Sequence, residues 1–300
     1  MLLQSITAIM ENDKEPSEYE IRIIEELRNS GATGNKKQGK WIENLREPLE
    51  KATSWIKKIP AIESIKEKTA QLIHAQLKVI KLDGFTFEQV ADKFRENGYT
   101  QINEPEDITQ LHLEDIDPLV KDICKKYQTL AKEEDDNASA VSLQSMPKDI
   151  VALVNLNRKA VSEYAAHYGF DITLEKERLF ALNILEYAAT NSKTAREHVM
   201  QRLIDQTKEM AGKQQVDLSK AAFLSMFSTL CGSISIKLLK AKVGEGFPVN
   251  GAIIGSGFNA YFTSEVCSAA QFFYKQRFLA EKYGSNIIEF KDLKHLTDGE

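Results

Sequence analysis

The chain has 300 residues, of which 42% are hydrophobic and 28% charged, and its formal net charge is −5. These proportions are those of a soluble globular protein and exclude a low-complexity or collagen-like chain. The acidic balance also argues against non-specific nucleic-acid binding, which depends on neutralising phosphates with Lys and Arg. We therefore expect no nucleic-acid partner.

The first predicted element is a short helix that begins at a capping box. Ser17 and Glu20 have the spacing at which each side chain can accept a hydrogen bond from the backbone N–H of the other. The apolar pattern continues to Leu27, and Gly31 can close the helix.

A basic segment, residues 36–81, follows. It contains eleven Lys and Arg against five Asp and Glu, a local net charge of +6, so the rest of the chain carries −11. Apolar residues recur every three or four positions, and Pro48 and Pro60 divide this pattern into amphipathic helices.

Both tryptophans of the chain lie on the basic segment. Trp and Lys on one amphipathic helix are typical of an interfacial membrane anchor, although a core Trp with solvated Lys residues gives the same pattern. The candidates to face a membrane are Lys36, Lys37, Lys40, Trp41, Trp55, Lys57 and Lys58.

The middle of the chain predicts a small helix, an irregular stretch and a longer helix. The small helical segment, residues 85–98, has Thr86 as its cap and Gly98 at its end. Asp117 and Pro118 have the character of an N-cap and a first-turn proline, so we expect a helix from there to residue 130. The acidic run 133–139 is the best candidate for a linker, and it lacks the ligand spacing of a calcium loop.

Further helices are predicted at residues 147–169, 173–190 and 194–212, with a last helix ending at Gly284. Before this last end come two uncharged stretches, residues 221–236 and 247–264.

These two stretches predict an apolar helical hairpin, and neither clearly reaches the roughly 18–20 apolar residues of a transmembrane helix. Gly251, Gly255 and Asn259 recur every four residues, a spacing that lets helices approach closely. Burial in the protein, partial membrane insertion and a lipid-like pocket beside nearby phenylalanines all remain open.

The three cysteines are Cys124, Cys231 and Cys267. Their odd number and the lack of CxxC spacing favour reduced thiols in a cytosolic protein. The first residues lack the basic region of a secretory signal. We therefore expect a cytoplasmic protein.

The predicted fold is all-α: a multi-helix bundle with a buried apolar C-terminal helical hairpin. Residues 1–116 form an N-terminal helical region that contains the basic segment and the small helical segment. Residues 117–284 form the helical core. Residues 285–300 are a loosely held tail.

No catalytic residue is assigned from the sequence, and no metal or cofactor is predicted. Glu163 and His167 lie one helical turn apart, but neither paired Glu-x-x-His motifs nor HExxH occurs. With Asp149 and Arg178 they form a weak candidate set for general acid–base chemistry in a helical cleft.

Two blocks of the chain resemble the EcsC protein family. Pro248, Gly251, Ala252, Asn259, Phe262, Arg277 and Leu279 are similar to the family's Pro-x-x-Gly-Ala, Asn-x-x-Phe and Arg-x-Leu patterns. Asp149, Arg158, Tyr168, Gly169 and Arg178 are similar to its Asp-led helix, Tyr-Gly-Phe turn and following Arg helix. The resemblance covers about residues 117–283 and implies a bacterial, mostly helical, cytoplasmic protein associated with membrane transport.

The function expected from these features is that of a non-enzymatic accessory factor, peripheral to the inner face of the cell membrane. Its expected partner is an anionic membrane surface or a membrane protein complex, reached through the basic segment. The alternatives are a hydrolase or a carrier for a hydrophobic small molecule. The oligomeric state is not predicted.

Overall fold

The computed structural model describes residues 15–33, 64, 67–69, 71–72, 86–137, 146–190, 193–211, 221–222, 225, 229–230, 232 and 258–288. The elements in chain order are α2 (Glu18–Thr33), α5 (Phe87–Glu96), α6 (Pro105–Ile108), α7 (Leu113–Val120), α8 (Ile123–Asn137), α9 (Met146–His167), α10 (Glu175–Ala189), α11 (Lys193–Ala211), α13 (Phe258–Tyr283) and the 3-10 helix η1 (Ser285–Ile288). No strand occurs among these described residues, which confirms the all-α prediction.

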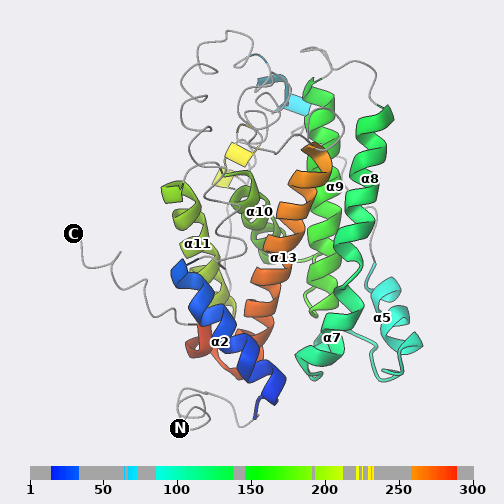
Figure 1. The fold of residues 1–300 in the computed structure, drawn as a ribbon, viewed down its shortest axis with the longest axis vertical. Coiled ribbons are helices and arrows are strands. Elements are labelled where there is room, and N and C mark those ends of the chain that lie inside the picture. Colours follow the sequence, from blue (N-terminus) through cyan, green and yellow to red (C-terminus); the bar gives the residue numbers. More distant parts are fainter. Residues whose placement is uncertain are drawn as a thin grey trace, which may run out of the picture.

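The bundle is built around α13, the longest described helix. It packs against α8, α9 and α10, and it also contacts α11 and α2. In Figure 1, α8, α9 and α13 run side by side, while α2 crosses the lower end near α7 and the end of α13. This arrangement brings the beginning and the end of the described chain to one end of the bundle.

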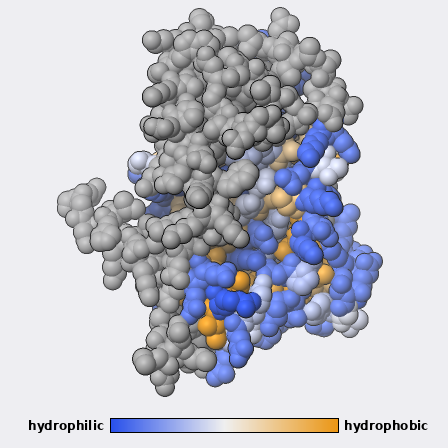
Figure 2. Space-filling model, in the orientation of Figure 1, coloured by the Kyte–Doolittle hydropathy of each residue, from blue (hydrophilic) through white to orange (hydrophobic). Residues whose placement is uncertain are grey.

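One cluster of buried apolar residues extends through the described helices from α2 to α13. The predicted boundary between residues 116 and 117 falls within α7, and the cluster continues across it. On the face drawn in Figure 2, the described surface is mainly hydrophilic, with smaller apolar areas between the polar side chains.

Several helix ends follow the predicted signals. Thr86 precedes α5, and its backbone N–H donates to the Gln89 side chain at 3.2 Å. Gly98 and Gly284 follow α5 and α13 with φ of 95° and 100°, which suits glycine because it has no Cβ to clash. The first helix continues past Leu27, and past the predicted closing residue Gly31, to Thr33.

The prediction of a helix start at Asp117 and Pro118 is wrong, because both lie inside α7. The helix begins earlier, where the backbone N–H of His112 donates to the Asp115 side chain at 3.1 Å. Pro118 removes one intrahelical donor, and the helical run is interrupted soon after, between α7 and α8. The predicted linker 133–139 is also partly helical, since α8 extends to Asn137.

Most of the predicted apolar hairpin and nearly all of the basic segment lie outside the described residues. None of the described helices combines the length and the apolar character needed to cross a membrane. The first four residues of the predicted tail form η1, where Ile287 is buried. The remainder of the tail lies beyond the described residues, so its looseness stays a prediction.

Candidate functional site

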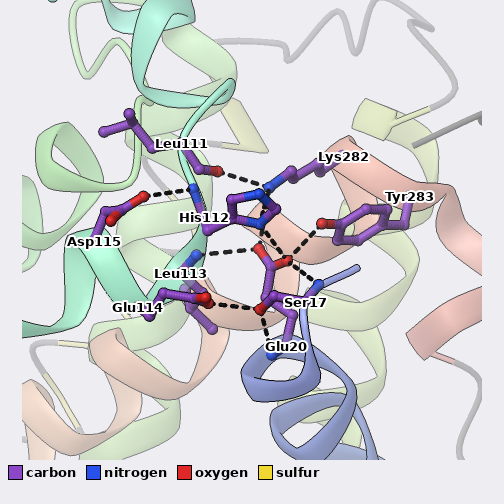
Figure 3. Close-up of polar contacts among 9 residues, drawn as sticks. All are labelled: Ser17, Glu20, Leu111, His112, Leu113, Glu114, Asp115, Lys282 and Tyr283. Carbon is purple, nitrogen blue, oxygen red and sulfur yellow. Dashed lines mark hydrogen bonds and ion pairs between the residues drawn. The ribbon is translucent and has the colours of Figure 1, made fainter. Parts of the chain in front are cut away.

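A buried carboxylate, Glu20, joins three elements at the lower end of the bundle (Figure 3). Its Oε1 accepts hydrogen bonds from the backbone N–H of Leu113 and from Lys282 Nζ, both at 3.1 Å. Its Oε2 accepts hydrogen bonds from the Tyr283 hydroxyl at 2.6 Å and from His112 Nδ1 at 2.9 Å. We call these five residues the Glu20 cluster.

The sequence predicted only the contact that Glu20 makes at the start of its own helix, with Ser17. The backbone N–H of Ser17 donates to Glu20 Oε2 at 3.0 Å, and the backbone N–H of Glu20 donates to Ser17 Oγ at 3.2 Å. This reciprocal pair is the capping box read from the spacing. The partners on α13 come from the other end of the chain, and no local pattern indicates them.

The donors around Glu20 keep it ionised. Burial alone would raise the pKa of this carboxyl, but hydrogen bonds from Tyr283, His112 and the Ser17 backbone, with the charge of Lys282, lower it to about 2. Burial and the Glu20 charge in turn raise the pKa of Tyr283 well above its ordinary value. The phenol therefore stays a proton donor to Glu20 at neutral pH.

A possible metal site lies beside the Glu20 cluster. Glu20, His112 and Glu114 place three ligand atoms within 4.8 Å of one another. A bound cation would need free lone pairs on Glu20, but both of its oxygens accept the hydrogen bonds described above. Lys282 Nζ already supplies the positive charge, at 3.1 Å from Oε1. The donor set therefore fits an internal ion cluster better than a metal centre.

A second carboxylate, Asp117, lies nearby and joins the same helices. It accepts a hydrogen bond from the Tyr19 hydroxyl of α2, and it forms an ion pair with Lys275 Nζ of α13 at 2.7 Å. The Tyr168 hydroxyl, just after α9, donates to it at 3.2 Å. The residue predicted to cap a helix is thus used to hold α2, α7, α9 and α13 together.

The third ionic contact is fully buried. Arg277 of α13 donates through both terminal nitrogens to Glu177 of α10, with Nη2 at 2.6 Å from Oε1. The guanidinium carbon lies 3.9 Å from the Phe170 ring centre and 5.0 Å from that of Phe180. Burial alone would lower the pKa of Arg277, but the charge of Glu177 raises it above its ordinary value.

Two aromatic residues flank a tight turn that leads to this pair. Gly169, between Tyr168 and Phe170, has φ of 82°, and a Cβ there would lie 2.7 Å from the Pro105 carbonyl oxygen. Only glycine fits both the conformation and the space. The turn and the buried ion pair therefore lie together. They include positions that carry the family resemblance or adjoin it: Tyr168, Gly169, Phe170 and Arg277.

The weak catalytic candidates Glu163 and His167 are brought together on α9. Glu163 Oε2 pairs with Lys126 Nζ at 2.7 Å, and His167 Nδ1 donates to the Glu163 backbone carbonyl at 2.7 Å. We call Glu163, His167, Lys126 and the nearby Lys93 the Glu163 cluster. Burial, with the charges of Lys93 and Lys126, lowers the pKa of His167 to about 4, against the backbone contact and charge of Glu163.

The other two catalytic candidates lie elsewhere. Asp149 precedes Glu163 by fourteen residues on the same helix, which is about 21 Å along its axis. Arg178 is exposed on α10, and its Nη2 donates to the Thr173 carbonyl at 2.6 Å. The described structure does not gather the four residues around one pocket.

The remaining positions of the resemblance are spread along two helices. Arg158 lies partly exposed on α9. Asn259 and Phe262 lie buried at the start of α13, where the Phe262 ring stacks on Phe258 with centres 6.3 Å apart. Gly251 and the seven membrane-facing candidates lie outside the described residues.

A family model described as the EcsC protein family matches residues 22–279. No curated protein and no solved structure matches the chain. The match begins within α2 and ends within α13, so it includes Arg277 and Glu177 but ends before Lys282 and Tyr283.

Proposed function

The chain belongs to the EcsC protein family, and we propose that it is a non-enzymatic accessory protein that docks on an anionic membrane surface. The observation that carries the proposal is the uneven charge. Residues 36–81 have a net charge of +6 within a chain of −5. A basic segment on an otherwise acidic protein is attracted to the negative cytoplasmic leaflet, and the acidic remainder disfavours contact elsewhere.

The tryptophans support the same surface. Trp41 and Trp55 are the only tryptophans of the chain, and both lie among the basic residues. Indole rings favour the boundary between headgroups and acyl chains, so they add an apolar contribution to the electrostatic one. This docking would hold the protein at the inner face of the cell membrane.

The placement of charged groups supports a non-enzymatic role. Glu20 and Glu177 have Lys282 and Arg277 as buried partners, so these charges hold helices together. The hydrolase alternative requires polar candidates that converge on a substrate. Asp149 and Arg178 lie away from Glu163 and His167 in the described residues, which favours the accessory role.

The test is sedimentation of the full chain with phosphatidylcholine vesicles, with and without phosphatidylglycerol, at low and high salt. A triple variant, Lys36→Glu, Lys37→Glu and Lys40→Glu, should weaken binding to the anionic vesicles by at least about 100-fold, since each well-placed Lys contributes about 1 kcal/mol. High salt should release the unmodified chain.

The matched control reverses three exposed lysines of the bundle, Lys121→Glu, Lys125→Glu and Lys132→Glu, with the same change in net charge. This variant should bind nearly as well as the unmodified chain. Equal loss in both variants would reduce the effect to net charge and overturn the assignment to the basic segment. No binding to anionic vesicles would overturn membrane docking and leave a protein complex as the partner.

Tryptophan fluorescence gives an independent readout. Because both tryptophans lie on the basic segment, a blue shift with anionic vesicles would report insertion of that segment alone. Binding without any shift would mean that another part of the chain contacts the lipid.

A further inference from the structure

Two of the three cysteines lie at the same level of neighbouring helices, Cys124 on α8 and Cys267 on α13. An ion pair that does not involve sulfur, Lys275 to Asp117 at 2.7 Å, joins α13 to α7 just before α8 begins. Cys267 lies eight residues before Lys275, and Cys124 lies seven residues after Asp117. At about 1.5 Å per residue Cys267 is about 12 Å from that ion pair along α13. Cys124 is the second residue of α8, just past the interruption that follows α7, and α8 packs along α13.

The two thiols interact across the packed surfaces of α8 and α13, and they differ in exposure. Cys267 and Ser264 of α13 both act on the Cys124 sulfur. Cys267 is buried, with 1% of its surface exposed, whereas Cys124 is half-buried. Small oxidants in solution can therefore reach one sulfur while the second lies behind it.

Small residues allow the two helices to approach closely here. Seven residues beyond Cys124 on α8 is Ala131, and seven residues before Cys267 on α13 is Ala260, and both alanines are buried. In the antiparallel register these alanines lie opposite each other. A disulfide needs Cα atoms about 4.4–6.8 Å apart, and small side chains along the seam favour such an approach.

The interaction also shifts the pKa values of the two cysteines in opposite directions. The hydrogen bond from Cys267, and a further one from Ser264, lower the pKa of Cys124 to about 7 in spite of its burial. The hydrogen bond to Cys124 and burial raise the pKa of Cys267 above its ordinary value. One sulfur is therefore partly thiolate at neutral pH, and the other keeps its proton as a donor.

We propose that Cys124 and Cys267 form a thiol redox site in which Cys124 reacts with a hydroperoxide and Cys267 then closes a disulfide between α8 and α13. This site is independent of membrane docking. Nothing in the EcsC match assigns it.

The two steps balance as follows. The Cys124 thiolate attacks one oxygen of the hydroperoxide, an S–O bond forms as the O–O bond breaks, and the leaving oxygen takes a proton. Cys124 is oxidised to a sulfenic acid and the peroxide is reduced to water or an alcohol. The Cys267 sulfur then attacks the Cys124 sulfur, the S–S bond forms, and the S–O bond breaks. The hydroxide that leaves takes the proton of Cys267 as water.

The test counts thiols in the full folded chain before and after hydrogen peroxide, with peptide mass spectrometry of the unreduced digest. The unmodified chain should fall from three free thiols to one, with a Cys124–Cys267 linked peptide that dithiothreitol separates. Cys231→Ser is the matched control and should still form the same link. Loss of the link in that variant, or a link to Cys231, would overturn the proposal.

Single variants test the order of the steps. In Cys267→Ser the sulfenic acid should persist on Cys124, where dimedone labels it. In Cys124→Ser, Cys267 should remain a thiol at the same peroxide dose, and labelling of Cys267 there would refute the assigned roles. Circular dichroism checks that each variant is folded, and the unmodified chain oxidised in urea should lose its preference for this pairing. Equal pairing in urea would show that the fold does not create the site.

Discussion

Two clusters of the bundle contain the same three kinds of side chain and bury them differently. The Glu20 cluster sits at the lower end, where Glu20 directly accepts hydrogen bonds from His112 and Lys282. In the Glu163 cluster the carboxylate pairs with Lys126, and His167 donates to a backbone carbonyl instead. The histidine of the first cluster is partly exposed, with 46% of its side chain accessible, and that of the second is fully buried.

The difference shows what decides the charge of a buried group. Around Glu20 four groups, Tyr283, His112, the Ser17 backbone and Lys282, outweigh the cost of burial, so the carboxylate keeps its charge. Around His167 burial dominates and two lysines add to it, so the imidazole stays neutral. In the first cluster the ionised form of Glu20 is the stable one in the folded protein. In the second, the neutral form of His167 is the stable one.

The largest effect should come from removing the carboxylate of the Glu20 cluster. Glu20→Leu leaves Lys282, whose side chain is only 3% exposed, without its buried counter-charge. Loss of one partner of a buried pair costs about 3–5 kcal/mol. The measurement is the free energy of unfolding from urea titrations followed by circular dichroism.

Glu18→Gln, on the exposed side of the same helix, is the matched control and should change stability by less than about 0.5 kcal/mol. If Glu20→Leu were as mild as this control, Lys282 would have to reach solvent by local rearrangement. The Glu20 cluster would then not stabilise the bundle.

The two clusters should also lose stability in different pH ranges. The pKa of Glu20 is about 2 when folded and 4.5 ordinarily, so its contribution is complete above 4.5 and is lost as the pH falls toward 2. The pKa of His167 is about 4 when folded and 6.5 ordinarily. The unfolded chain binds this proton first, so stability falls as the pH drops from 6.5 toward 4. Each group contributes about 3 kcal/mol over its range.

Unfolding free energies measured from pH 7 to pH 3 should therefore fall in two stages. His167→Gln removes the upper titration and should flatten the curve between pH 6.5 and 4.5, while the steeper fall below that remains. A wild-type curve that is already flat between pH 6.5 and 4.5 would mean that His167 takes up its proton in the folded protein at the same pH as in the unfolded chain.

How far the sequence predicts this molecule depends on whether the signal is local. Ser17 and Glu20 reveal a capping box because both partners lie in one helical turn. Gly98 and Gly284 mark helix ends because the required backbone conformation is local as well. The all-α class follows from many such signals together.

The clusters themselves depend on contacts between distant parts of the chain. Glu20 and Tyr283 are hydrogen-bonded although 263 residues separate them in the sequence, and Arg277 and Glu177 are 100 residues apart. The predicted helix start at Asp117 was wrong because the local pattern fits an N-cap. The carboxylate of Asp117 instead binds Tyr19 and Lys275. Of the catalytic candidates, Glu163 and His167 lie four residues apart on one helix, and His167 Nδ1 reaches only the backbone carbonyl of Glu163. The interaction of that pair with Lys126 had no local signal.

A smaller effect is expected within the Glu163 cluster, and it should be asymmetric. Lys126 has half of its side chain exposed, whereas that of Glu163 is 6% exposed. Glu163→Gln frees Lys126 to turn toward water and should cost about 1 kcal/mol. Lys126→Gln leaves the buried carboxylate with a weaker partner and should cost more, about 2 kcal/mol. Urea titrations of both variants compare the two values, and the reverse order would mean that Lys93 replaces Lys126 as the partner of Glu163.

The smallest effect should come from His112, although it lies in the cluster with the largest one. The carboxylate of Glu20 can only accept, so His112 Nδ1 must carry the proton in the 2.9 Å contact, and Gln can supply an equivalent N–H. The other donors to Glu20 remain in place, and the imidazole is half exposed. His112→Gln should therefore change the unfolding free energy by less than about 0.5 kcal/mol. A loss close to that of Glu20→Leu would show that the histidine, and not Lys282, holds Glu20 in place.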